Sequence, residues 1–363
     1  MTTPDVLGAE RTAHLDSCAF DAAAEAFESA TRSQPPALRQ LYYRVAGQPV
    51  RVRIVGRQLA TALERPWAHL ASADDDDAEE SALTIDVWHE AETGIPHPEP
   101  AIHADFGLYG YMTVSEDLRF IAEQRPHSVQ WFDRRANRAI VWISALDRLC
   151  LDERARPFHR VLALCLGELG VQFVHAGLVA WDEDGVLFTG KGGSGKSTCS
   201  LSCALDGAAY LGDDFIGLES EPDGSFRGHS LYGTALISPA HMTLYPVLAA
   251  NCSAGNYREE DKSVVDIASL PSVHLARQTA ICAIVLPRVL AGASRTTFER
   301  VGAREALLAL APSSVLYLPG AGPKAIERLG GLVERIPSYR LELGSDPSQI
   351  PARVQEILAE VRQ

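Results

Sequence analysis

A glycine-rich stretch in the second half of the chain constrains the fold most strongly. Residues 190–197 read Gly-Lys-Gly-Gly-Ser-Gly-Lys-Ser, which matches the whole pattern of two glycines five positions apart followed by lysine and serine. An apolar run over residues 186–189 precedes the stretch, and a helical pattern follows it. A strand, a glycine-rich loop and a helix in this order predict a phosphate-binding turn in an α/β or α+β domain.

Each residue type in this loop has a chemical reason to be there. Glycines permit backbone angles that other residues avoid, and they let amide groups turn toward phosphate oxygens. Lys196 would supply a cation for the terminal phosphates, and the hydroxyl of Ser197 would bind Mg²⁺. We therefore expect ATP and Mg²⁺ as cofactors. The residues expected to bind them are Gly190, Gly192, Gly193, Ser194, Gly195, Lys196, Ser197 and Thr198.

Two adjacent carboxylates follow the loop closely. Asp213 and Asp214 come after one predicted helix and a short apolar run over residues 208–211. At a strand end beside the phosphates, one carboxylate can hold Mg²⁺, directly or through water, while the other accepts a proton from an attacking hydroxyl. His175 lies in the apolar segment that leads into the predicted hairpin, just before Ala176-Gly177, and placed beside Asp213 it could tune the proton affinity of that carboxylate or relay its proton. We expect Lys196, Asp213, Asp214 and His175 to be catalytic, and Ser197 and Asp214 to ligate the metal.

The first half of the chain has the two-residue alternation of half-buried strands. Residues 50–54 and 83–87 alternate in this way, and residues 128–132 and 139–143 predict a hairpin with a longer loop. The acidic run at residues 74–80 is better explained as a solvated loop than as a cation site.

An amphipathic helix is predicted over residues 157–169, where apolar residues recur every three or four positions. Near this helix we place the boundary between two domains. A strand-rich accessory or acceptor-recognition domain would span residues 1–155, and a nucleotide domain would span residues 156–363.

Strands and helices alternate in the second half. An apolar segment over 171–181 and a strand over 186–189 flank a strong turn signal, and a helix should run from Gly195 or Lys196 to near Gly207. Toward the C-terminus we expect strands at residues 315–318 and 339–343, a helix at 324–334, and a final amphipathic helix. The apolar face of that last helix consists of Ile350, Val354, Ile357, Leu358 and Val361.

Composition narrows the partners. The formal net charge of −14 would repel a polyphosphate backbone, which argues against nucleic acid as a partner. No uncharged apolar run approaches the roughly 20 residues that a membrane helix needs. Seven scattered cysteines and an N-terminus without an apolar core predict reduced thiols and a cytoplasmic location.

The order of these features resembles a known family. His175-Ala-Gly, a strand hairpin, the glycine-rich loop and then Gly-Asp-Asp resemble the C-terminal domain of HPr kinase/phosphorylase over roughly residues 165–345. The pattern is closest to the HPr-kinase-like enzymes of natural-product gene clusters, including lasso-peptide precursor kinases. The resemblance implies a phosphoenolpyruvate-carboxykinase-like nucleotide fold, phosphorylation of a hydroxyl (usually serine), and base and metal roles for Asp213 and Asp214 assisted by His175.

The chain also departs from that family. It has Ala176 where the true HPr enzymes usually have glycine, and its nearest match to their glycine-rich signature, residues 230–234, is poor. Because the related kinases often have a lysine in a similar place, Lys262 is expected to contact a phosphate or stabilise developing charge. Arg258 and Arg288 are weaker candidates.

Four functions remain open from the sequence. The leading one is an ATP- and Mg²⁺-dependent serine-kinase-like phosphotransferase whose acceptor is a peptide or a small hydroxylated metabolite. The alternatives are an HPr serine kinase acting on a carrier protein, a nucleotide-binding switch without catalysis, and an ATPase. The sequence does not identify the acceptor or the preference for ATP over GTP. It also does not reveal the role of the N-terminal domain or whether the protein is a homo-oligomer.

Overall fold

The chain folds as two units of mixed α/β structure. The first unit consists of Met1–Tyr42, Val50–Thr61 and Asp74–Leu149, and the second of Tyr43–Pro49, Ala62–Ala73 and Cys150–Gln363. The computed structural model describes residues 17–72, 82–98, 111–115, 119–254, 262–316 and 323–363. The acidic run at residues 74–80 and the candidate Arg258 therefore lie outside the described residues.

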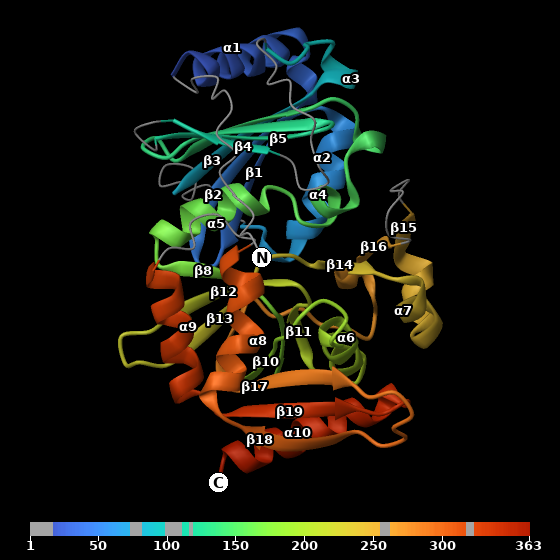
Figure 1. Cartoon of the computed structure of the whole chain (residues 1–363). Coiled ribbons are helices and arrows are strands. Elements are labelled where there is room, and N and C mark those ends of the chain that lie inside the picture. Colours follow the sequence, from blue (N-terminus) through green and yellow to red (C-terminus); the bar gives the residue numbers. More distant parts are fainter. Residues whose placement is uncertain (1–16, 73–81, 99–110, 116–118, 255–261, 317–322) are drawn as a thin grey trace, which may run out of the picture. The chain divides into compact units, whose positions relative to one another are not determined.

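A mixed seven-stranded sheet supplies the first unit with most of its structure (Figure 1). Its order is β1-β2-β3-β7-β6-β5-β4, with β2, β3 and β7 parallel and the β4-β5-β6-β7 meander antiparallel. The strands are β1 (Leu38–Val45), β2 (Gln48–Val55), β3 (Leu83–His89), β4 (Tyr111–Val114), β5 (Phe120–Arg125), β6 (Ser128–Asp133) and β7 (Arg138–Ile143). The alternating segments and the hairpin predicted from the sequence are confirmed.

Helix α1 (Ser17–Ser33) covers one face of this sheet. It packs Phe20 and Phe27 into an apolar cluster with Trp88 and Trp131, whose rings stack with centroids 6.2 Å apart. The short helices are α2 (Arg57–Glu64) and α3 (Glu90–Thr93). The first unit thus has its own core, because the alternation of its strands gives one apolar side to cover.

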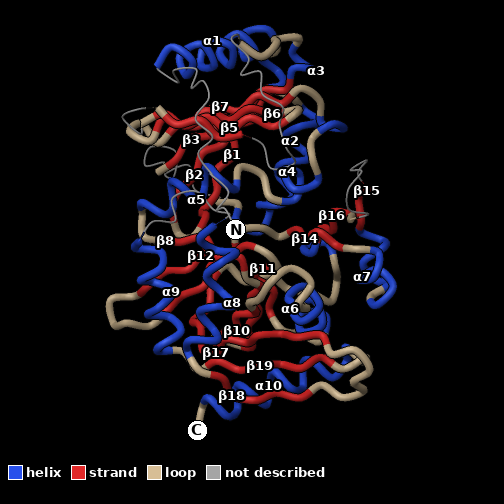
Figure 2. The backbone as a smooth tube through the Cα atoms, in the orientation of Figure 1, coloured by secondary structure: helices blue, strands red, loops and turns tan. Residues whose placement is uncertain are grey.

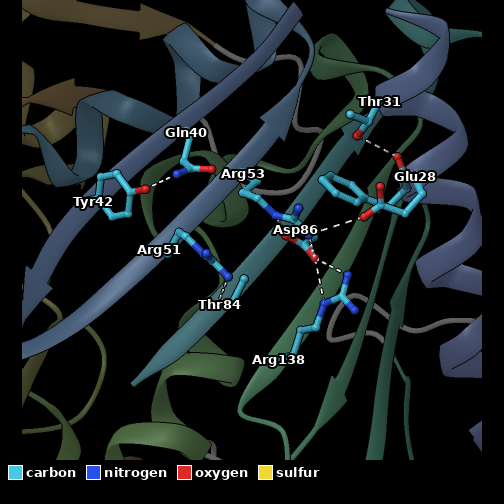
Figure 3. Close-up of polar contacts among 10 residues, drawn as sticks. Glu28, Thr31, Gln40, Tyr42, Arg51, Arg53, Thr84, Asp86 and Arg138 are labelled. Carbon is cyan, nitrogen blue, oxygen red and sulfur yellow. Dashed lines mark hydrogen bonds and ion pairs between the residues drawn. The ribbon is translucent and has the colours of Figure 1, made fainter. Parts of the chain in front are cut away.

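One carboxylate is completely buried in the first unit, and Figure 3 shows it between two arginines. Asp86 accepts hydrogen bonds from Arg53 at 2.6 and 2.7 Å and from Arg138 at 2.6 and 2.8 Å. The guanidinium of Arg53 also lies 4.8 Å from the ring centre of Phe27. Hydrogen bonding to Asp86 raises the pKa of Arg53. Both oxygens of the buried carboxylate are therefore held by positive charge, as a buried anion requires.

The second unit is built on a nine-stranded mixed sheet (Figure 2). The main path runs β11-β9-β10-β17-β13-β12-β8, and β19 pairs with both β17 and β18. The strands are β8 (Val171–His175), β9 (Gly177–Trp181), β10 (Asp184–Phe188), β11 (Ala209–Gly212), β12 (Phe215–Ser220), β13 (Phe226–Ser230), β17 (Gln278–Val289), β18 (Thr297–Val301) and β19 (Ser338–Leu343). A separate small sheet has the order β14-β16-β15, from β14 (Thr234–Ile237), β15 (Cys252–Ala254) and β16 (Ser263–Asp266).

Helices cover both faces of the nine-stranded sheet. On one face α8 and α9 contribute Leu310 and Leu329 to the core, and on the other face α6 and α10 contribute Cys199 and Val354. The helices of this unit are α4 (Leu151–Ala155), α5 (His159–Glu168), α6 (Lys196–Leu205), α7 (Pro239–Leu244), α8 (Ala303–Leu316), α9 (Pro323–Arg335) and α10 (Ile350–Val361). Expected helices at 157–169, 196–207, 324–334 and the C-terminus are confirmed in position.

Two expectations for this unit are corrected. The apolar segment over residues 171–181 is interrupted at Ala176, so that β8 pairs with β12 while β9 pairs with β10 and β11. Val315 and Leu316, expected to begin a strand, lie in α8, and residues 317–318 of that predicted strand are outside the described residues. A short apolar run suits a buried helix as well as a strand, and here the packing of Ala306 and Leu310 continues the helix.

Within the described residues, no helix is long and apolar enough to span a membrane.

Candidate phosphate-binding and catalytic site

The glycine-rich loop joins the end of β10 to the start of α6. Its glycines at 190, 193 and 195 have φ angles of +147°, +76° and +111°, which favour glycine over other residues. Position 195 requires glycine for a second reason, because a Cβ there would lie 2.5 Å from Cδ1 of Leu343. Helix α6 begins at Lys196, as predicted, so its first amides and the positive end of its dipole lie at the end of the loop.

The side chain of Lys196 folds back over this loop. Its Nζ donates hydrogen bonds to the backbone oxygens of Gly190 at 2.8 Å and Lys191 at 3.5 Å. Burial lowers the pKa of Lys196, while the negative charge of Asp213 acts in the opposite direction. The predicted phosphate-binding lysine and the predicted acid are therefore in electrostatic contact.

The loop offers groups that suit a phosphate and its metal. The Ser194 hydroxyl is buried and has no hydrogen-bond partner among the described residues, and it lies close enough to Gly190 that a Cβ there would come within 2.8 Å. Ser197 is half-buried in the first turn of α6. Within the described ranges, no cluster of three or more His, Cys, Asp or Glu could hold a metal ion. A hydroxyl and few carboxylates still fit Mg²⁺, which in nucleotide sites takes most of its ligands from phosphates and water.

The acid pair lies between β11 and β12. Asp213 is only 4% exposed, and its Oδ1 accepts a hydrogen bond of 3.0 Å from the hydroxyl of Tyr210. Burial and the adjacent carboxylate raise the pKa of Tyr210 well above its ordinary value, so this phenol stays a donor. A Cβ on Gly177 would lie 2.2 Å from Oγ of Ser200 and 3.6 Å from Cα of Asp213. The glycine after His175-Ala176 thus lets α6 and the acid approach β9 closely.

Asp214 is engaged at both oxygens. Nε2 of His175 lies 2.6 Å from Oδ1, and Arg156 forms an ion pair with Oδ2. Burial, together with the positive charges of Lys196 and Arg156, lowers the pKa of His175 to about 3. The imidazole is therefore neutral near pH 7, and it donates its Nε2 hydrogen to the carboxylate. The backbone N–H of His175 donates to Ser314 on α8 at 3.1 Å, which fixes the end of β8.

An aromatic ring and an arginine complete the surroundings of Asp214. The guanidinium of Arg156 lies 5.0 Å from the ring centre of Phe215 and also pairs with Asp152. His159 stacks on the same ring at 5.8 Å, and His175 tilts against it at 5.6 Å. The sequence analysis did not identify Arg156 or Phe215. Phe215 could have been found as the neighbour of the acid pair, whereas no local signal marks Arg156.

A second group of side chains meets the first turn of α6 from helix α7. Nε2 of His241 lies 3.0 Å from Oγ1 of Thr198, and Nδ1 lies 2.8 Å from Oγ of Ser238. Burial lowers the pKa of His241; the charge of Asp213 opposes this and that of Lys262 adds to it. Lys262, which directly precedes β16, is thus within electrostatic range of His241, the residue that contacts Thr198. His241 was also missed, although Ser238-Pro239 marks the start of its helix.

The structure brings most of the predicted residues together. Lys196, Asp213, Asp214 and His175 surround the end of the loop, and Thr198 connects it to the side that carries Lys262. Arg288 is set apart, with a 63% exposed side chain 4.0 Å from Glu342. These positions leave the roles assigned from the sequence as predictions.

Comparison with known proteins adds little to this site. No protein-family model matches the chain, and no curated protein matches it. Among solved structures, the Hpr(Ser) kinase/phosphatase from Coxiella burnetii matches with 16% sequence identity and a TM-score of 0.30, covering 53% of this chain and 99% of that one. A TM-score this low supports no inference about activity, so the function proposed below depends on the residues of the site.

Proposed function

We propose that the second unit is a kinase that transfers the γ-phosphoryl group of ATP to a hydroxyl, either of a serine in a peptide or of a small hydroxylated metabolite. The observation that carries this proposal is a nearly buried carboxylate, Asp213, in electrostatic contact with the lysine of a glycine-rich loop. A loop that binds phosphates needs no buried acid for binding alone. An acid there can take the proton of an attacking hydroxyl.

The two carboxylates suit different tasks. Asp213 has a single neutral donor on one oxygen among the described residues, whereas Asp214 is compensated by Arg156 and hydrogen-bonded to His175. Because Asp213 is not held by a guanidinium or an imidazole of the described residues, its carboxylate can accept a hydrogen bond from an acceptor hydroxyl. We therefore assign the base role to Asp213 and a positioning role to Asp214 and His175.

In the proposed reaction the acceptor hydroxyl gives its proton to Asp213 while its oxygen forms a bond to the γ-phosphorus. The bond from that phosphorus to the bridging oxygen of ADP breaks, and ADP leaves. Loop amides, the Ser194 hydroxyl and Lys196 would neutralise the phosphate oxygens, since such transfer depends on positioning and charge rather than on a covalent intermediate. Mg²⁺, when bound by Ser197 and, through water, by Asp214, would supply further neutralisation.

The test is product mass spectrometry. The protein would be incubated with ATP, Mg²⁺ and a panel of serine-containing peptides, serine-like metabolites and HPr, beside the Lys196→Ala and Asp213→Asn variants. Asp223→Asn is the matched control, because Asp223 lies in an exposed turn outside the site. A phosphate adduct on one acceptor, formed by wild type and the control but by neither site variant, is the expected result.

Three other results would replace this proposal. Phosphorylation of HPr alone would favour a carrier-protein kinase. Release of inorganic phosphate that is indifferent to every acceptor would indicate an ATPase. Tight ATP binding without any transfer, unaffected by Asp213→Asn, would indicate a nucleotide-dependent switch.

A further inference from the structure

The edge of the sheet at the glycine-rich loop has two sides. Strand β10, which leads into the loop, pairs in parallel with β17, and β17 pairs in parallel with β19. The carboxyl ends of these three strands therefore lie at one edge, and β17 and β19 lie on the opposite side of β10 from β9. In open α/β sheets, ligands bind beyond such carboxyl ends.

The acid pair occupies the other side. Gly177, the first residue of β9, pairs with Phe188 at the end of β10, and the backbone of Asp213 lies against Gly177. If the proposed kinase function holds, the γ-phosphate must face Asp213. The rest of a nucleotide held by the loop then extends away from the acids, toward the ends of β17 and β19.

An exposed apolar side chain lies on that side. Val289, the last residue of β17, is 62% exposed, although its partner across the strand pair, Leu343, is 4% exposed. A Cβ on Gly195 would lie 3.8 Å from Cγ2 of Val289 and 3.6 Å from Cβ of Pro287. Val289 and Pro287 thus border the last glycine of the loop. Arg288, between them in the strand, belongs to the opposite face because side chains alternate.

Next to Val289, the loop over residues 290–296 is hydrogen-bonded to the segment over residues 344–349. Thr296 donates its N–H to Oε1 of Gln349 at 2.9 Å, and Gln349 donates to the backbone oxygen of Ser294 at 3.2 Å. The N–H of Gly344 donates to Thr296 at 3.1 Å, and that of Ser345 donates to Ala293 at 2.9 Å. A pre-formed surface binds a rigid ring without paying for loop ordering.

We propose that Val289, next to Pro287 and the final glycine of the loop, is the apolar platform for the nucleobase of the bound nucleotide. Nucleotide-sized ligands are held mostly by apolar contacts with a few polar groups for orientation, and Val289 supplies such a contact beside the phosphate loop. The platform accounts for an exposed valine whose cross-strand partner, Leu343, is almost fully covered.

The experiment separates the base from the phosphates. Dissociation constants for Mg²⁺-ATP and for inorganic tripolyphosphate with Mg²⁺ would be measured by calorimetry on the full chain, for wild type, Val289→Ser and Val289→Phe. Ile326→Ser is the matched control, since Ile326 is 51% exposed on α9 and none of the hydrogen bonds or ion pairs described at the site involves that helix. Val289→Ser should weaken ATP binding about fivefold, from the lost apolar contact, and leave tripolyphosphate binding unchanged. Val289→Phe should tighten ATP binding only.

Three results would overturn the platform: unchanged ATP binding in Val289→Ser, equal weakening for ATP and tripolyphosphate, or wild type binding ATP no more tightly than tripolyphosphate. Failure of the platform and failure of the kinase proposal are distinguished by running the phosphoryl-transfer assay on wild type as well. If wild type transfers phosphate but Val289→Ser leaves ATP binding unchanged, the platform is refuted and the kinase proposal stands. If wild type prefers ATP over tripolyphosphate, loses that preference in Val289→Ser and transfers no phosphate, the platform stands and the kinase proposal is refuted.

Discussion

Two regions of the molecule bury a carboxylate, and they treat it differently. Asp86 in the first unit is fully buried, and both of its oxygens accept hydrogen bonds from guanidinium groups (Figure 3). Asp213 in the second unit is 4% exposed, and the one hydrogen bond described for its side chain comes from a neutral phenol. Asp214, its neighbour, resembles Asp86 in having an arginine partner.

This difference in hydrogen-bond partners distinguishes a carboxylate that stabilises the fold from one that can still contact a ligand. A buried anion held by two cations has no capacity left for a ligand, and its role is to stabilise the sheet around it. A buried anion with spare acceptor capacity costs stability, which is typical of groups retained for chemistry. The four predictions that follow test this contrast.

The largest effect is expected for Asp213→Asn, which removes the proposed base and keeps the size of the side chain. Phosphoryl transfer should fall about 10²- to 10⁴-fold, the range for loss of a general base. Steady-state kinetics beside ATP titration would check this. ATP affinity should change little and the unfolding midpoint should stay the same or rise, because the buried charge is removed; a large loss of stability instead would make Asp213 a structural residue like Asp86.

Asp86→Ala should act on stability alone. Removing this carboxylate takes the shared anion from Arg53 and Arg138 and leaves Arg53 only its longer ion pair with Glu28 at 3.7 Å, so we expect the unfolding free energy of the first unit to fall by about 3–5 kcal/mol. Denaturant titrations in which hydrogen exchange of amides in the first unit is the probe would measure this change in unfolding free energy. Arg51→Lys is a control, since Arg51 donates to the hydroxyl of Thr84 rather than to a carboxylate. An unfolding free energy that does not move would refute the structural assignment.

Arg156→Ala should give an intermediate effect on catalysis. Without this arginine, Asp214 keeps its hydrogen bond to His175 but loses its compensating charge, and a charged hydrogen bond of this kind contributes about 1.5–3 kcal/mol. We therefore expect kcat to fall about tenfold to a hundredfold with little change in ATP affinity, and Arg156→Lys to restore part of it. Equal losses in both variants, with a lowered unfolding midpoint, would indicate a packing role only.

The smallest effect concerns pH and His175. Its folded pKa of about 3 lies below the ordinary value of 6.5, so between these values the unfolded chain binds the proton that the folded chain refuses. The stability contributed by neutral His175 is therefore present above pH 6.5 and is lost as pH falls toward 3. From pH 7 to pH 5 wild type should lose about 1–2 kcal/mol more stability than His175→Gln. Parallel pH profiles for the two proteins would contradict the neutral imidazole.

Local patterns predicted much of the fold. Alternation identified β2, β3 and the β6–β7 hairpin, and apolar spacing identified α5 and α10, because each pattern depends on neighbours in the chain. The break at Ala176 was not predictable, since an apolar run does not reveal which strand will pair with each half. The helical state of Val315 was missed for the same reason.

The candidate site divides in the same way. The loop, Lys196 and the acid pair follow one another closely enough to be recognised from spacing. Arg156, directly after α4, contacts Asp214, and His241 in α7 contacts Thr198, so only tertiary packing brings them together. Their types and positions carry no periodic signal, so a single sequence cannot connect them to the loop.

The short distance along the chain between His175 and the acid pair has a consequence for folding. The strand end, the hairpin, the loop, helix α6 and both aspartates all lie within residues 171–215. Closing so short a stretch costs little chain entropy, and local contacts of this kind form fast. This part of the candidate site can therefore assemble early as one continuous piece of chain, with Arg156, His241 and the ends of β17 and β19 joining it later.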